Sequence, residues 1–235
     1  VNAVLSPVAA RPAKAKGVSE AEWRTRCDLA ALYRLAALHG WGDLLATHIS
    51  ARVPDEREHF LINPYGMLFE EITASSLLKV DEQGRVLGDT DYIINPAGFV
   101  IHSCIHIARP DIDCVMHLHT RDGNAVATQK CGLLPATQHA LVIYDQVTYH
   151  DFEGPALDPD EQSRLVADLG DKRIMILRNH GTLTAGRTIG EAFVLMYRIE
   201  RACRMQIAAQ SGGQELNPLP QSVIDKSIEG GRTIF

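Results

Sequence analysis

Histidines at metal-ligand spacing are the residues of this sequence that most directly suggest chemistry. His117 and His119 are separated by one residue in the run from Val115 to Thr120. On a β-strand, both side chains would point to the same face, with their Cα atoms about 7 Å apart. Two imidazole rings at that spacing can bind one cation, with metal–nitrogen distances of about 2.1 Å.

A third histidine follows a second apolar segment. Residues 173–178 predict a buried strand, and Asn179, His180 and Gly181 predict a turn at its end. We expect Gly181 to permit a sharp turn that aims His180 away from the strand end. If the two strands are neighbours, three imidazoles with open water positions give the layout of a catalytic divalent-metal site. Spacing alone leaves open that these are surface or hydrogen-bonded histidines.

A second histidine pair lies on a predicted helix that begins at Pro96 and ends at Ala108. His102 and His106 are four residues apart, which is also a ligand spacing. Because the helix is otherwise apolar, we interpret them as core residues, or as side chains that orient a metal-bound imidazole. His102 is our candidate for that orienting role.

Acid–base side chains are dense between His139 and Glu153. Tyr144, Asp145 and Tyr149 lie in this segment and are the candidates for a proton donor. A polar rim would have the same composition, so both interpretations stay open at this point.

Alternating periodicities predict the elements that must position these side chains. Ser19 and Glu22 form a capping box before a helical pattern that ends at Gly40. Residues 47–53 predict a strand whose apolar side chains face inward and whose polar side chains face outward, the latter being His48, Ser50 and Arg52. Further strands are expected at 59–63, 77–81, 85–87 and 113–119 and within 135–144, a loop at 149–155, and helices at 122–130, 158–169 and 188–209.

Composition bounds the class of protein. The 235 residues, 46% hydrophobic and 22% charged, predict one α/β domain over 18–211. We expect a disordered basic arm at 1–17 and a C-terminal tail at 212–235 interrupted by glycine and proline.

The net charge of −6 argues against nucleic-acid and anionic-lipid partners, and no apolar run approaches the length of a membrane helix. Five scattered cysteines favour free thiols in a reducing cytoplasm.

Four segments together resemble the class II aldolase/adducin family. They are residues 95–102, 108–111, 117–120 and 179–181. The resemblance implies a three-layer α/β/α sandwich around a mixed, largely antiparallel sheet, and a homotetramer with sites between subunits. It matches His117, His119 and His180 to the family's ligands of one divalent metal. That metal is zinc in the aldolases, and Fe²⁺ and Mn²⁺ are alternatives here.

The sequence also departs from the sugar-phosphate aldolases of that family. Gly98 occupies the place of their acid–base glutamate, and glycine can neither bind metal nor move a proton. Their phosphate-binding residues match three places here, Thr47-His48, Asn63 with Gly66, and Pro96-Ala97. Most of that polar cradle is therefore expected to be absent.

These observations predict a metal-dependent lyase of the aldolase or decarboxylase type. Its expected substrate is a small hydroxy- or oxo-carbonyl compound chelated to the metal through two oxygens, and not a sugar phosphate. Two alternatives remain. A three-histidine site also suits a non-haem Fe(II) oxygenase, and Gly98 fits a non-catalytic, adducin-like interaction protein.

Overall fold

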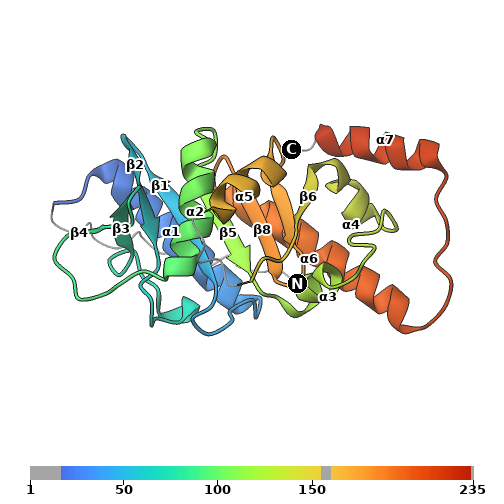
Figure 1. The fold of residues 1–235 in the computed structure, drawn as a ribbon, viewed down its shortest axis with the longest axis horizontal. Helices are drawn as coiled ribbons and strands as arrows, with labels where there is room; N and C mark the ends of the chain where they lie inside the picture. The colour runs from blue at the N-terminus through green and yellow to red at the C-terminus, as the bar shows by residue number, and fades with distance from the viewer. Residues whose placement is uncertain (1–16, 155–159, 234–235) are drawn as a thin grey trace, which may run out of the picture.

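A single eight-stranded sheet runs through the molecule (Figure 1). The computed structural model describes residues 17–154 and 160–233, so nearly all of the predicted arm lies outside the described residues. The strand order is β4-β3-β2-β1-β5-β8-β7-β6. The strands are β1 (His48–Val53), β2 (Glu56–Ile62), β3 (Leu78–Asp81), β4 (Val86–Leu87), β5 (Cys114–Leu118), β6 (Val147–His150), β7 (Ile174–Leu177) and β8 (Gly181–Gly186). Only β6 and β7 pair in parallel among these strands, which confirms the mixed, largely antiparallel sheet.

Helices cover both faces of the sheet and complete the three layers. The helices of the described residues are α1 (Glu20–Leu38), α2 (Pro96–Ala108), α3 (Arg121–Ala127), α4 (Gln138–Leu141), α5 (Glu161–Leu169), α6 (Ile189–Ser211) and α7 (Gln221–Arg232). Helices α1 and α6 share one hydrophobic cluster with one face of the sheet, whereas α2 and α5 share a second cluster with the other face. No helix in the described part of the chain has the length and apolar character needed to cross a membrane.

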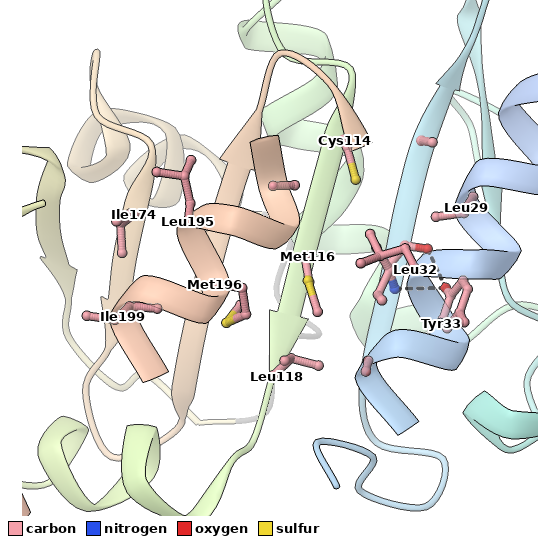
Figure 2. Packing of buried hydrophobic residues seen from close by; sticks show 14 of the residues in the cluster. Leu29, Leu32, Tyr33, Cys114, Met116, Leu118, Ile174, Leu195, Met196 and Ile199 are labelled. Atoms are coloured by element: carbon pink, nitrogen blue, oxygen red, sulfur yellow. Dashed lines mark hydrogen bonds between the residues drawn. The ribbon is translucent and has the colours of Figure 1, made fainter. Parts of the chain in front are cut away.

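Strand β5 shows how the sheet divides its side chains between the two layers. Cys114, Met116 and Leu118 point into the cluster formed with α1 and α6 (Figure 2). Val115 points to the opposite face, into the cluster with α2 and α5. Because successive side chains on a strand alternate, His117 also lies on the α2 face. The position of α2 therefore decides what surrounds this histidine.

Strand β1 corrects the expectation for its polar side chains. All six of its residues are buried, so His48, Ser50 and Arg52 do not face solvent. Helix α2 packs over this face of the strand, and these polar side chains hydrogen-bond to groups on α2 or just after it. The alternation along the strand was predicted correctly. The face that was predicted to be exposed is instead a buried, polar layer between β1 and α2.

Three other expectations change. Residues 135–144 contain α4 and no strand, because Thr137 caps a short helical turn by accepting from the Ala140 amide. Strand β6 includes the first two residues of the predicted 149–155 loop. The expected tail contains α7, which follows an extended segment and contacts α4 (Figure 1). Ser19 caps α1 as predicted, accepting from the Glu22 amide at 3.0 Å, whereas the predicted cap at Asp158 lies outside the described residues.

Candidate metal centre

The end of β5 brings the first two candidate ligands together. His117 is buried on the strand, and His119 follows it at the start of the connection to α3. Their Nε2 atoms are 3.0 Å apart. Nitrogens bound to one zinc ion at about 2.1 Å lie about 3.0 to 3.4 Å apart in octahedral or tetrahedral geometry. The i and i+2 spacing therefore places both rings as predicted from the strand periodicity.

The turn between β7 and β8 supplies the third ring. Strand β7 is not adjacent to β5, because β8 lies between them. His180 nevertheless reaches the site because the turn carries it past β8. Its ring centroid lies 4.8 Å from those of His117 and His119. The ligand atoms of the three histidines all lie within 4.8 Å of one another, so the set can hold one ion.

Gly181 is needed at this turn for a different reason from the one predicted. The left-handed residue of the turn is Asn179, with φ of 57°. A Cβ on Gly181 would lie 2.4 Å from the Leu118 carbonyl oxygen and 3.0 Å from a carbon of the His119 ring. The glycine therefore permits close approach of the two chain segments that carry the histidines.

Hydrogen bonds behind the rings orient their lone pairs. His117 Nδ1 lies 3.1 Å from the Thr182 carbonyl oxygen, and His119 Nδ1 lies 3.1 Å from Asp43 Oδ2. Since both partners are acceptors, each Nδ1 carries a hydrogen, which leaves Nε2 as the nitrogen that can bind a cation. The lone pairs of the two Nε2 atoms then point toward each other. A cation bound between them would stabilise this arrangement. Metal-binding histidines commonly have such carbonyl or carboxylate partners.

Burial keeps these rings in the form that binds metal. Desolvation lowers the pKa of His117 well below its usual range, and the neighbouring histidines lower it further. Desolvation, with the nearby His119, lowers the pKa of His180 to about 4. Both rings are therefore neutral at pH 7, and a metal ion does not have to displace a proton from them.

A cavity of about 760 Å³ opens in front of the three histidines. Its walls are mainly apolar, from Leu44, Leu45, Ile101 and Phe152, with Tyr65 and Asn95 as polar additions. None of the described residues that line it is a lysine or an arginine. The cavity is therefore large enough for a small organic molecule, but its described wall has no cationic side chain to bind a phosphate group.

The predicted proton donors lie elsewhere in the described chain. Asp145 accepts from Arg232 of α7 at 2.6 Å. The Tyr149 hydroxyl accepts from the Leu133 amide at 3.0 Å, and Tyr144 packs against the hydrophobic core. None of the three lines the cavity as far as the chain is described.

His48 lies at this site, although the alternation along its strand predicted a solvent-facing side chain. It is paired with His117 in the β1–β5 register, and it lines the cavity. A Cβ on Gly98 would lie 2.6 Å from its ring, so His48 occupies the space beside the glycine. His102, expected to orient a metal ligand, instead hydrogen-bonds to His48 Nδ1 at 2.8 Å. The sequence analysis missed Asp43, because nothing in the sequence connects its loop to His119.

Comparison with known proteins identifies a matching family, related sequences and related structures. Residues 27–207 match the model of the Class II Aldolase and Adducin N-terminal domain. A crystal structure of an aldolase II superfamily protein from Pseudomonas syringae has a TM-score of 0.89 and 55% identity, over 92% of this chain and 87% of that one. L-fuculose 1-phosphate aldolase from Glaciozyma antarctica PI12 has a TM-score of 0.81 and 28% identity, over 93% and 86%. Alpha-adducin of Mus musculus is 46% identical over 195 residues, which are 81% of this chain and 26% of that protein.

Proposed function

This chain belongs to the Class II Aldolase and Adducin N-terminal domain family, and from that premise we propose that it is a metal-dependent lyase of the aldolase or decarboxylase type. The observation that carries the proposal is the convergence of His117, His119 and His180 at the wall of a cavity large enough for a small substrate. A scaffold has no need of three histidines that converge on one point, whereas a catalytic metal site does.

We propose that these three histidines hold one divalent cation, Zn²⁺ before Fe²⁺ or Mn²⁺. A cation bound by three imidazoles supplies a Lewis acid for a substrate carbonyl oxygen. Asp43 and the Thr182 carbonyl hold two of the rings in the tautomer that binds metal. The wall beside the three histidines is mainly apolar and includes Leu45, Ile101 and Phe152.

The proposed substrate is a small hydroxy- or oxo-carbonyl compound without a phosphate group. The absence of lysine and arginine from the described wall of the cavity supports this choice. Gly98 also sets the chain apart from the sugar-phosphate aldolases, because a glycine has no carboxyl group with which to move a proton. The chemistry that remains is cleavage beside a carbonyl group, by retro-aldol reaction or by decarboxylation.

We also propose that the protein acts as a homotetramer in the cytoplasm. Leu38 and Leu44 are 81% and 76% exposed, and Leu44 lies at the wall of the cavity. A second copy that covered these leucines would help to close the site. Light scattering on the purified protein would measure the assembly, and a monomer at micromolar concentration would contradict this part of the proposal.

Enolisation is the step that both lyase types share, so its measurement tests the proposal without the natural substrate. The zinc-loaded protein is incubated in D₂O with small oxo acids and hydroxyketones, and loss of the α-proton signal is followed by ¹H NMR. We expect exchange that disappears in His117→Ala and after removal of zinc. No exchange with any compound would overturn the proposal. Oxygen consumption by the iron form would then favour the oxygenase, and its absence an adducin-like interaction protein.

A further inference from the structure

A second cavity, of about 290 Å³, lies between α3, α6 and the segment that follows α1. Three arginines line it, Arg121, Arg201 and Arg204, and we call it the arginine pocket. It shares no described lining residue with the cavity in front of the three histidines. Two stretches of chain, 39–46 and 119–122, nevertheless contribute residues to both cavities. The arginine pocket is therefore a separate site that neighbours the candidate metal centre.

Helix α6 places two of the arginines on one face. Tyr197, Arg201 and Arg204 are four and three residues apart, which is the spacing of side chains that are neighbours on a helix surface. Helix α3 packs against α6 and follows Arg121 into the same pocket (Figure 1). Arg121 is paired with the adjacent Asp122 at 2.9 Å. The guanidinium groups of Arg201 and Arg204 have no carboxylate partner within the described part of the chain.

The guanidinium of Arg201 is held in position by an aromatic ring. Its Cζ lies 5.9 Å from the centroid of the Tyr197 ring. Its Nε is buried and has no hydrogen-bond partner among the described residues. Buried donors in proteins are paired with a protein group, an ordered water or a bound molecule in most cases, because an unmade hydrogen bond is costly. Arg201 thus presents a charged donor in this pocket that no described side chain uses.

The carboxyl groups of the pocket are already engaged. Asp122 accepts from Arg121 Nε at 3.0 Å. Glu200 is 6% exposed and accepts from the Thr120 hydroxyl. Burial raises the pKa of the Glu200 carboxyl to about 7, so this group is in part protonated at neutral pH. The two arginines of α6 consequently give the pocket a net positive charge, in a protein whose overall charge is −6.

Aromatic rings complete the wall beside the arginines. The rings of His39 and Trp41 are stacked, with centroids 4.6 Å apart and planes 20° apart. The His39 ring also lies 5.8 Å from that of Tyr197. An organic group attached to a bound anion would contact these rings, since aromatic faces bind flat and apolar groups.

We propose that the arginine pocket binds a phosphate group, through the guanidinium groups of Arg201 and Arg204. A planar guanidinium donates two parallel N–H hydrogen bonds to phosphate oxygens, which gives both affinity and orientation. The volume of about 290 Å³ is at the lower end of the range for ligand sites and suits phosphate with a small organic group. This binding site does not depend on the proposed lyase function, because its residues are not those of the other cavity.

Calorimetric titration of the zinc-loaded protein at constant ionic strength tests the proposal, with inorganic phosphate and phenyl phosphate as the probes. We expect saturable binding that weakens about tenfold or more in Arg201→Gln and in Arg204→Gln, since each removes a charged hydrogen-bond donor. Arg24→Gln is the matched control, because Arg24 is an exposed arginine of α1 that does not line the pocket. Tighter binding of phenyl phosphate would identify the ligand as a phosphorylated small molecule, and equal binding would identify it as free phosphate.

Three results would overturn the proposal. The first is the absence of saturable binding of either probe at millimolar concentration. The second is binding that survives both arginine variants but disappears in His117→Ala, which would place the probe on the metal. The third is a wild type that binds neither probe, combined with an Arg204→Gln variant whose assembly has a lower mass by light scattering. These arginines would then contact a second copy of the chain and not a phosphate group.

Discussion

Six of the ten histidines form two triads about one strand apart. The two triads differ in how their ring nitrogens face one another. The metal triad, His117, His119 and His180, presents its nitrogen lone pairs to a common point. The relay triad, His48, His102 and His106, places a donor opposite an acceptor at every link, with Ser50 in the middle. A cation between the facing lone pairs would stabilise the metal triad. The hydrogen bonds of the relay triad need no cation.

The difference lies in what stands behind each ring. In the metal triad the outer nitrogens of His117 and His119 meet oxygen acceptors, so their inner nitrogens are bare. In the relay the outer nitrogens meet other rings or the serine, so no two lone pairs face each other. Residue type is shared by the two sets, and we propose that the hydrogen-bond partner of each ring decides which set binds metal.

Removal of one metal ligand should give the largest effect. We expect His117→Ala to lower zinc affinity by at least about three orders of magnitude, because each ligand contributes several kcal/mol to binding. The matched change in the relay, His106→Ala, removes a buried histidine of the same size and should leave the zinc content near one per chain. Competition with a chromophoric chelator measures both affinities, and equal losses would erase the distinction between the triads.

The glycine that brings the metal triad together should come next. Gly181→Ala places a Cβ 2.4 Å from the Leu118 carbonyl oxygen, and backbone cannot move aside cheaply. We expect a loss of about 3 kcal/mol in the free energy of unfolding, with weaker zinc binding. Gly190→Ala in α6 is the control, since its Cβ would contact only Thr188 Oγ1 at 3.9 Å. Urea denaturation that gave both variants the same stability would refute the packing argument.

The relay has its own packing partner in Gly98. Gly98→Ala places a Cβ 2.6 Å from the His48 ring, and we expect it to cost about 2 kcal/mol of stability. In a His48→Ala background the clash is absent, and the same change should stabilise α2 by about 0.5 kcal/mol through helix propensity. A double-mutant cycle by urea denaturation measures this coupling. Additive effects would show that His48 does not occupy the space beside Gly98.

The dependence of stability on pH tests the burial of His106 in the relay, and near neutral pH its effect is small. The folded pKa of His106, about 3, lies below the unfolded value of about 6.5, so the unfolded chain binds the extra proton first. The stabilisation is complete above pH 6.5 and falls by about 1.4 kcal/mol per pH unit as the pH drops toward 3. His106→Phe keeps the stacking on Phe60 and removes this slope. An unchanged dependence of stability on pH would show that His106 titrates normally when folded.

The fold and the grouping of the metal triad could be predicted from the sequence because they depend on local patterns. The strand carrying His117, the turn carrying His180 and the helix after Pro96 each have their own periodicity or turn residues. The family resemblance supplied the mixed, largely antiparallel sheet, and the observed strand order brings the turn beside β5. Local spacing therefore predicted the grouping of the three histidines, although the strand adjacent to β5 is β8 and not β7.

The hydrogen bonds of the relay could not be predicted from the sequence, because they depend on which helix covers this face of the sheet. Alternation along β1 correctly separated His48 and Ser50 from the apolar side chains, but it gave no sign that α2 packs over them. Asp43 illustrates the same limit, since it reaches His119 from a loop 76 residues away in sequence. Contacts of this kind are set by tertiary packing, for which a single sequence has no periodic signal.

Anomalous diffraction at the zinc edge, from crystals grown with zinc, tests the central claim most directly. The account predicts one strong peak per chain, about 2.1 Å from a nitrogen of each of His117, His119 and His180, and no peak at the relay. A peak bound by His48, His102 or His106, or the absence of any peak among the three predicted ligands, would contradict the division of the six histidines into a metal-binding set and a hydrogen-bonded set.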